Sequence, residues 1–324
     1  MGLLGSDGKV GGIFANVNGA KKEIVSVWAN KDGVATKVYG EKPALFVACD
    51  ADGELWWSAD GIAWEQGNAN NAGYIIRGVT YGNGLFVAVG EGGNIFYSED
   101  GKVWTRNKVS DVYFYGVTYG NGLFIAVGKS GYIYRSSDGI SWTLGGITSG
   151  GSDLRRVTYG NGLFVAVGGS SKIYYSTDGK TWAAGSGSSV TIRGVTYGNG
   201  KFVAVGNQGA TYYSTNGKTW TAGNVTGSND TLIEVGYGNG KFITSGSGGA
   251  AYYSTDGKTW TAVSVGTTAY LNSIAYGDEK YVIVGDGGVG YYSTDGNTWS
   301  PCTGMGTYNL YGVAYRIDGG SDRT

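Results

Sequence analysis

An internal repeat constrains the fold of this chain more than any other feature. The phrase G-V-T-Y-G-N-G, or a close variant, recurs through most of the 324 residues. A second phrase, S-x-D-G-x-x-W, occurs seven times, first at Ser58–Trp64 and last at Ser293–Trp299, and only Asn216 departs from its aspartate. A fixed period of this length is typical of a repeat architecture. The valine or isoleucine of the first phrase stands at positions 38 to 40 residues apart, namely Val79, Val117, Val157, Val195, Val235, Ile274 and Val313.

Each repeat unit contains four segments with the pattern of short β-strands. In one unit they are Gly78–Tyr81, Leu85–Val89, Ile95–Ser98 and Val103–Thr105. Asn83-Gly84 separates the first two and favours a two-residue hairpin, because both residues tolerate positive φ angles. The apolar run Leu85–Val89 is expected of a strand buried on both faces. Four strands per unit, repeated seven times, predict an all-β, seven-bladed β-propeller of four-stranded blades. A parallel β-helix is the alternative, but its rungs are shorter and lack tight hairpin turns.

The order of the phrases at the chain ends predicts how the ring closes. The first blade begins with its second strand, Leu45–Cys49, and the last copy of the first phrase, Gly312–Arg316, has no blade of its own. We therefore expect the C-terminal strand to supply the missing first strand of the first blade. Such closure removes two exposed sheet edges.

Residues 1–40 do not follow the blade pattern. Phe14–Ile24 and Trp28–Val38 are similar to one another at an offset of 14 residues, and their Asn-Gly and Asp-Gly pairs align, so each predicts a β-hairpin. Isolated hairpins bury little apolar area, so we expect them to pack on the propeller, on each other or on a partner. We divide the chain into an extension at 1–40, for attachment or oligomerisation, and a propeller at 41–324.

Composition excludes several classes of function. The chain has no histidine, which is the commonest general base and metal ligand, and only two cysteines, Cys49 and Cys302, whose pairing stays open. The 24 basic and 25 acidic residues balance, so no basic field exists to hold nucleic acid or anionic lipid. Asp50–Gly53 is similar to the start of a calcium loop whose remaining ligands are missing. We predict no cofactor, no metal, no nucleic-acid partner and no membrane insertion.

One residue per blade is placed to ring the mouth of the central channel. It stands two positions before the repeated valine, on the face that carries the blade-to-blade connections, which we call the varied face because these connections differ between copies. Arginine and tyrosine around a funnel suit an anionic sugar or a carboxylate, since guanidinium groups form forked hydrogen bonds. The alternative is that each arginine pairs with a local acid such as Asp153 or Asp230. The ring residues are Arg77, Tyr115, Arg155, Arg193, Ile233, Asn272 and Tyr311.

Aromatic residues on the connections of the varied face are further binding candidates. These connections are rich in Gly, Ser, Thr and Asn, a composition that combines adaptable hydrogen bonding with rigid aromatic anchors. The alternative is that the aromatic rings cap the outer blades. The candidates are Tyr74, Tyr113, Tyr270 and Tyr308.

The S-x-D-G-x-x-W phrase resembles the Asp-box, or BNR repeat, of sialidase-like propellers. The resemblance implies a folding element on the turn between the third and fourth strands, distant from any active site. Its serine and aspartate are expected to bond the turn backbone, its glycine to take a left-handed conformation and its tryptophan to pack into the next blade.

The N-terminal hairpin motif resembles a tandem motif common in tail and appendage proteins of bacteriophages, which often join it to GVTYGNGLFVAVG propeller repeats. The resemblance implies a virion appendage protein, with a host cell-surface glycan or protein as one partner and other virion proteins, through the extension, as another. A homo-oligomer is an open alternative. The implied location is the virion, with the extracellular space or cell surface as the alternative.

We therefore predict a non-enzymatic phage appendage protein that binds a host-surface receptor, a glycan, through the varied face. The first alternative is a bacterial surface or secreted propeller that binds carbohydrate or protein. The second is a sialidase-like glycosidase. The even, short connections disfavour it, and so does the isolation of Glu234, which leaves no activated tyrosine nucleophile and no evident carboxylate pair.

Overall fold

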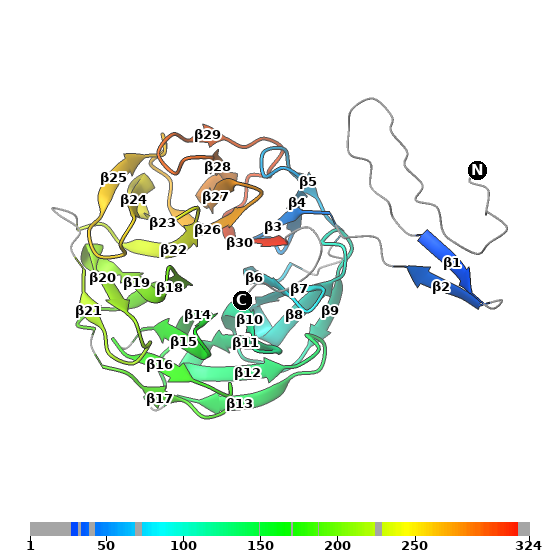
Figure 1. Ribbon diagram of the computed structural model, residues 1–324, viewed down its shortest axis with the longest axis horizontal. Coiled ribbons are helices and arrows are strands. Elements are labelled where there is room, and N and C mark those ends of the chain that lie inside the picture. The colour runs from blue at the N-terminus through cyan, green and yellow to red at the C-terminus, as the bar shows by residue number, and fades with distance from the viewer. Residues whose placement is uncertain are drawn as a thin grey trace.

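The computed structural model describes residues 27–31, 34–38, 43–68, 73–148, 150–169, 171–186, 188–223 and 229–316. Seven four-stranded sheets lie around a central axis, and strands β1 and β2 form a two-stranded sheet of their own (Figure 1). This confirms the prediction of an all-β, seven-bladed propeller. Within these ranges no helix has the length and apolar character that a membrane span requires.

The strands of each blade are paired antiparallel in chain order from the axis outward. Blade 2 consists of β6 (Ile76–Gly82), β7 (Leu85–Gly90), β8 (Asn94–Ser98) and β9 (Thr105–Lys108). Blades 3 and 4 consist of β10 (Phe114–Gly120), β11 (Leu123–Gly128), β12 (Tyr132–Ser136) and β13 (Thr143–Ile147), then β14 (Leu154–Gly160), β15 (Leu163–Gly168), β16 (Ile173–Ser176) and β17 (Ala183–Ala184). Blades 5 and 6 consist of β18 (Ile192–Gly198), β19 (Lys201–Gly206), β20 (Thr211–Ser214) and β21 (Thr221–Ala222), then β22 (Leu232–Gly238), β23 (Lys241–Gly246), β24 (Ala250–Ser254) and β25 (Thr261–Ser264). Blade 7 consists of β26 (Leu271–Gly277), β27 (Lys280–Gly285), β28 (Gly290–Ser293) and β29 (Ser300–Pro301).

Short 3-10 turns follow the second strand in five blades of the described chain. The first residue of each turn carries a side chain at the end of that strand. The turns are η1 (Glu91–Gly93), η2 (Lys129–Gly131), η3 (Asn207–Gly209), η4 (Ser247–Gly249) and η5 (Asp286–Gly288).

Blade 1 closes the ring with the two ends of the propeller sequence. Its order is β30 (Leu310–Arg316), β3 (Leu45–Asp50), β4 (Leu55–Ser58) and β5 (Glu65–Gln66), and β30, red in Figure 1, lies beside the blue β3. The register pairs Val313 with Ala48 and Arg316 with Leu45. The predicted closure by the C-terminal strand is confirmed.

Arg316 ends the closing strand at the position where the other blades have glycine. Its side chain is buried, with Nε donating to the carbonyl of Pro43 at 3.1 Å and Nη1 donating to that of Glu99 at 3.1 Å. The guanidinium also lies over the Tyr81 ring, 5.8 Å from its centroid. The closing strand is thus held to blade 2 as well as to blade 1.

The glycines of the repeated Y-G-N-G turn serve two different purposes. Asn83 and Gly84 both have positive φ, 48° and 77°, as a two-residue hairpin turn requires. Gly82 instead lies beneath the tyrosine of the following blade, and a Cβ there would stand 2.1 Å from Cγ of Tyr119. The first glycine therefore allows the blades to approach closely.

The S-x-D-G-x-x-W turn is held by the same hydrogen bonds in all seven copies. In blade 2, Asp100 Oδ1 accepts the Ser98 hydroxyl and the amides of Lys102 and Val103, while Ser98 Oγ accepts the amide of Gly101. Gly101 has φ of 78°, as expected. Because Asp100 binds the amides of Lys102 and Val103, the fourth strand begins at Thr105 and not at Val103, where the sequence placed it.

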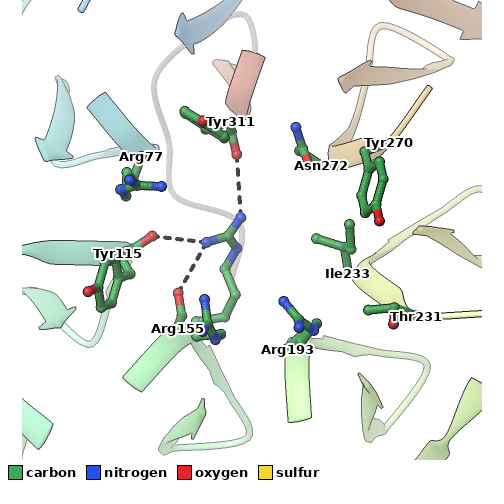
Figure 2. Close-up of a pocket in the computed structure, with 10 residues that line it drawn as sticks. Arg77, Tyr115, Arg155, Arg193, Thr231, Ile233, Tyr270, Asn272 and Tyr311 are labelled. Atoms are coloured by element: carbon green, nitrogen blue, oxygen red, sulfur yellow. Dashed lines mark hydrogen bonds between the residues drawn. The ribbon is translucent and has the colours of Figure 1, made fainter. Parts of the chain in front are cut away.

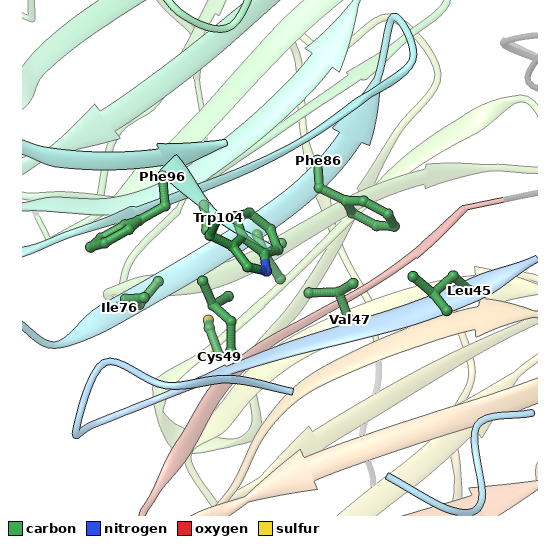
Figure 3. Close-up of a cluster of buried hydrophobic side chains, with 10 residues drawn as sticks. Leu45, Val47, Cys49, Ile76, Phe86, Phe96 and Trp104 are labelled. Carbon is green, nitrogen blue, oxygen red and sulfur yellow. The ribbon is translucent and has the colours of Figure 1, made fainter. Parts of the chain in front are cut away.

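Apolar clusters fill the interfaces between neighbouring blades, and they correct the predicted direction of the tryptophan. Trp104 of blade 2 lies in a buried cluster with Leu45 and Val47 of blade 1 and with Phe86 of its own blade (Figure 3). The prediction that it packs into the next blade is wrong. The turn lies over the preceding blade, since a Cβ on Gly101 would meet Leu45 at 2.6 Å.

The extension is described only in part. Strand β1 (Val27–Lys31) pairs antiparallel with β2 (Val34–Val38), and Lys31 faces Val34 across the turn, in agreement with a hairpin at Trp28–Val38. The expected hairpin at Phe14–Ile24 lies outside the described residues. The division of the chain at residue 40 stays a prediction.

Candidate functional site

The seven ring residues converge at one end of the central channel. They line a cavity of about 290 Å³, and Figure 2 shows their side chains arranged around a common centre. Eight of the eleven candidates from the sequence, the seven ring residues and Tyr270, are brought together here. The lining residues are Arg77, Tyr115, Arg155, Arg156, Arg193, Thr231, Ile233, Tyr270, Asn272 and Tyr311. We call this cavity the mouth pocket.

The other three predicted residues lie outside the lining of the mouth pocket. Tyr74, Tyr113 and Tyr308 are exposed. The Arg106 guanidinium lies 5.2 Å from the ring centroid of Tyr74, and the Lys129 ammonium lies 5.5 Å from that of Tyr113. These aromatic rings form an outer, separate set, and their binding role stays a prediction.

A β-bulge aims each ring residue into the pocket. In blade 2 the register between β6 and β7 shifts between Ile76 and Gly78, so that Arg77 is the unpaired residue. The other blades show the same shift at the corresponding residue. Bulges commonly re-aim a side chain in this way, which explains why one residue per blade leaves the regular alternation of its strand.

In three blades the ring residue binds the side chain that stands fourteen positions later in the sequence. Arg77 Nη2 lies 2.5 Å from Glu91 Oε1, Arg193 Nε donates to Asn207 Oδ1 at 2.6 Å and Asn272 Nδ2 donates to Asp286 Oδ1 at 2.7 Å. The corresponding position for Arg155 is Gly169, which has no side chain. Accordingly, Arg155 Nε is buried and has no hydrogen-bond partner in the structure.

Two of the three predicted arginines therefore have no acidic partner in the part of the chain that the structure describes, although the Arg155 guanidinium lies 6.0 Å from the ring centroid of Tyr115. Within the described residues, neither Arg155 nor Arg193 forms an ion pair. The expected alternative partners are engaged elsewhere, since Asp153 accepts the amide of Ser130 and Asp230 accepts the Tyr252 hydroxyl. Pairing with a local acid holds for Arg77 alone, and the acid is Glu91.

Burial and like charge both act on this cluster. Burial lowers the pKa of Arg193, and the positive charge of Arg155 lowers it further. Burial raises the pKa of Tyr115, with a smaller contribution from Asp153. An anion between Arg155 and Arg193 would relieve the repulsion between them.

Arg77 lines the pocket, but its guanidinium is already engaged by other residues of the protein. Its guanidinium lies between two tyrosines of the neighbouring blades, 5.8 Å from the ring centroid of Tyr115 and 5.0 Å from that of Tyr311. With Glu91 on the same guanidinium, both its charge and its faces are largely occupied. This also uses one face of each tyrosine ring.

Of two charged residues at the site, the sequence reasoning missed Arg156 and took Glu234 to be isolated, whereas the structure pairs them. Arg156 and Glu234 follow ring residues directly, at the position that is glycine in four other blades. Arg156 Nε donates to Glu234 Oε2 across the channel, and its Nη1 donates to the carbonyls of Tyr115 and Arg155 at 2.9 and 3.1 Å. The departure from glycine in the repeated phrase was the signal that could have revealed them.

A second cavity of about 320 Å³ continues along the channel from this bridge. Arg156 lines both cavities, and the deeper one is bordered by Glu234 and by threonines such as Thr118 and Thr196. Burial raises the pKa of Glu234, while the Arg156 guanidinium opposes the rise. The mouth pocket and the channel cavity thus meet at one buried ion pair.

The remaining candidates from the sequence are structural. Asp50 is buried and accepts the Trp56 indole N–H at 2.9 Å and the Glu54 amide at 2.8 Å, so its carboxylate holds a turn. Cys49 and Cys302 are free thiols and do not form a disulfide. The described part of the chain holds no cluster of three or more His, Cys, Asp or Glu that could bind a metal ion.

Comparison with solved structures finds the propeller in proteins of different activity. No protein-family model matches the chain, and no curated protein matches it. A structure titled YCF48 bound to D1 peptide has 19% identity and a TM-score of 0.57, covering 72% of this chain and 86% of that one. A streptogramin B lyase has 12% identity and a TM-score of 0.67, covering 74% and 86%. A catalytically inactive virginiamycin B lyase from Staphylococcus aureus with quinupristin has 13% identity and a TM-score of 0.63, covering 85% and 96%.

These comparisons correct one prediction from the sequence. We predicted that the chain is not an enzyme, and the finding that overturns this is an enzyme, the streptogramin B lyase, with the same propeller fold over most of its length. The missing histidine and the missing carboxylate pair argue against particular mechanisms and do not exclude catalysis. At these identities the likeness shows the fold and assigns no activity to this chain.

Proposed function

We propose that the mouth pocket binds an anionic ligand, a carboxylate-bearing sugar of a host-surface glycan, and that the propeller acts as a receptor-binding module through it. The observation that carries this is the pair Arg155 and Arg193, which line the pocket without an acidic partner among the described residues. Guanidinium groups bind carboxylates through charge-assisted, forked hydrogen bonds.

The rest of the lining suits a sugar ring. The cavity of about 290 Å³ is at the small end of ligand pockets, which begin at roughly 300 Å³. Ile233 and Tyr270 offer apolar surface, and Thr231 and Asn272 offer polar groups next to the arginines. A sugar has apolar ring faces and many hydroxyls, so this mixture matches it. An acidic peptide is the competing ligand, since YCF48, a propeller of the same fold, is bound to a peptide.

Within this proposal we place the module on a bacteriophage virion, attached through residues 1–40. The support is the resemblance of the hairpin motif and of the propeller repeat to phage appendage proteins. A single shallow pocket binds weakly, and display of many copies on one particle gains avidity of roughly 10²–10⁴. Immunogold labelling of phage particles, with a chain lacking residues 1–40 as the comparison, tests the location, and absence of label on particles contradicts it.

The binding experiment compares two variants that lose the same charge on the same face. Arg155→Ala with Arg193→Ala removes the two unpaired cations of the pocket. Arg106→Ala with Lys129→Ala removes the two cations that lie over Tyr74 and Tyr113 outside it. Each protein is tested on an array of acidic and neutral glycans and of acidic peptides.

We expect the pocket variant to lose acidic-glycan binding by about 100-fold, since a hydrogen bond to a charged group contributes about 1.5–3 kcal/mol. The outer variant should bind as the wild type does. If the outer variant loses binding and the pocket variant keeps it, the site lies on the outer connections. If the wild type binds acidic peptides on the array and no acidic glycan, the ligand is a peptide and not a glycan.

A further inference from the structure

The bridge between Arg156 and Glu234 joins blades that are not neighbours. Arg156 belongs to β14 of blade 4 and Glu234 to β22 of blade 6, so the pair passes over blade 5. The strand of blade 5 gives room for it, because Gly194 lies there and a Cβ on that residue would stand 2.9 Å from Glu234 Oε1. Both side chains are largely buried, with 20% and 10% of their surface exposed.

The guanidinium of Arg156 also holds the main chain of the ring. Beyond Glu234, it donates to the carbonyls of Tyr115, Arg155 and Tyr311, the last at 3.4 Å. The dashed lines in Figure 2 end on these main-chain oxygens. All three acceptors are ring residues, and they belong to blades 3, 4 and 1. One side chain therefore fixes the spacing of three residues that line the pocket.

The bridge adds no net charge to the site. The guanidinium and the carboxylate cancel one another, and the carboxylate also accepts the amide of Val235 at 3.1 Å. The bridge stands where the mouth pocket meets the channel cavity, since Arg156 lines both. We therefore expect its effect on a ligand to come from geometry more than from net charge.

We infer that Arg156, held by Glu234, is a positioning residue at the floor of the mouth pocket, and that the pair keeps Tyr115, Arg155 and Tyr311 at the spacing a ligand requires. This inference rests on the proposed function for the identity of the pocket. Groups that orient a ligand-binding shell through hydrogen bonds commonly contribute 10- to 100-fold in affinity at metal sites.

The chain itself supplies the variant that tests this inference. Arg156→Gly with Glu234→Gly places glycine where blades 2, 3, 5 and 1 already have Gly78, Gly116, Gly194 and Gly312. The double variant keeps the net charge of the protein. Ser273→Gly makes the same change in blade 7, outside the bridge, and is the matched control for binding and for exchange at β10, β14 and β22; exchange at β30 is left out of this comparison, because the Ser273 hydroxyl accepts the Val313 amide of that strand at 3.2 Å. Arg156→Lys keeps the charge but cannot reach three carbonyls and a carboxylate at once.

Two readouts are needed, and the first requires no ligand. Hydrogen–deuterium exchange should become at least about ten-fold faster at the innermost strands β10, β14, β22 and β30 of the double variant and of Arg156→Lys, with the outer strands unchanged. The second readout is saturation-transfer NMR with sodium glucuronate, for which we expect about ten-fold weaker binding by both variants. Ser273→Gly should match the wild type in glucuronate binding.

The outcomes separate the two levels of the proposal. If the wild type binds neither glucuronate nor any other acidic sugar, the proposed function is wrong. Hydrogen–deuterium exchange alone then tests whether the bridge orders the ring residues. If exchange and binding of the double variant both equal those of the wild type, the bridge positions nothing. Faster exchange with unchanged binding also overturns the positioning role, since the ring would then be ordered by the bridge without consequence for the ligand.

Discussion

At the scale of single residues, small differences between equivalent positions decide the chemistry of the pocket. Arg77, Arg155 and Arg193 occupy the same place in their blades, yet the residue fourteen positions later is Glu91, Gly169 and Asn207 respectively. The ring positions follow from the repeat and were predictable. Their partners were not, because a bulge and a 3-10 turn bring residues together that no strand pattern relates.

Gly169→Asp should give Arg155 the internal partner that it lacks. A Cβ at this glycine would stand 3.7 Å from the carbonyl oxygen of Asp153, an ordinary van der Waals contact, so the main chain accepts a side chain here. We expect glucuronate binding to weaken about ten-fold because the new carboxylate competes for the guanidinium. Gly169→Asn offers hydrogen bonds without charge and should change binding less than three-fold or so. Titration by NMR measures both, and equal effects of the two variants would contradict a role for the free charge.

The S-x-D-G-x-x-W turns predict a specific dependence of stability on pH. Hydrogen bonds from the amides of Thr181 and Lys180 hold the pKa of Asp178 at about 2. A lowered pKa stabilises the fold above the unfolded value, about 3.9, and this contribution is lost as pH falls from about 4 to about 2. Urea unfolding of wild type and Asp178→Asn between pH 2 and 7 should show a difference at neutral pH that disappears in this window.

Asn216 shows that an amide makes the same bonds, since its Oδ1 accepts the amides of Lys218 and Thr219. Asp178→Asn should therefore be less destabilised at pH 7 than Asp178→Ala, which we expect to lose about 1 kcal/mol. Ligand affinity should stay unchanged in both variants. Loss of binding without loss of stability would show that the turn belongs to a site.

At the scale of strands and turns, the repeat predicted the elements better than their contacts. The hairpins, the buried second strands and the left-handed glycines follow from local sequence. The direction in which Trp104 packs does not, because the phrase specifies the turn and leaves open which neighbouring blade lies under it. The direction depends on how two blades pack, since Gly101 lies against Leu45 of the preceding blade.

Gly120→Ala tests the close approach of blades at the tyrosine of the repeated phrase. A Cβ at Gly120 would stand 2.1 Å from Cγ of Tyr159 in the next blade, so the ring or the strand must move. We expect a loss of about 1–3 kcal/mol, as for other overpacked interiors. Chemical denaturation measures it, and adding Tyr159→Ala should cost less in Gly120→Ala than in the wild type. Strict additivity of the two changes would contradict the steric account.

At the scale of the whole molecule, closure by β30 joins the two ends of the propeller sequence in one sheet, and we expect it to make the ring one cooperative unit. The order of the phrases at the two chain ends predicted this pairing, and blade 1 confirms it. The bonds of Arg316 to Pro43 and Glu99 were not predictable, because they arise only where the closing strand meets its neighbours. The cross-channel pair of Arg156 and Glu234 is of the same kind, since only the closed ring brings the two residues together.

Truncation before Leu310 should leave β3 as an open edge and abolish cooperative unfolding. Arg316→Gly keeps the strand and introduces the residue that other blades have there, so it should lower the melting temperature while the transition stays single. Calorimetry distinguishes the two, because the truncated chain should lose the transition or split it. A truncated chain that melts as the full chain does would refute closure as a source of stability.

The central claim is that an acidic ligand binds between Arg155 and Arg193, and a crystal structure of the protein soaked with glucuronate tests it most directly. We predict a carboxylate within hydrogen-bond distance of both guanidinium groups, about 2.7–2.9 Å, with the Arg156–Glu234 bridge intact beneath it. Glucuronate bound at Tyr74, Tyr113 or Tyr308 instead, or a mouth pocket without ligand at a saturating concentration, would contradict the claim.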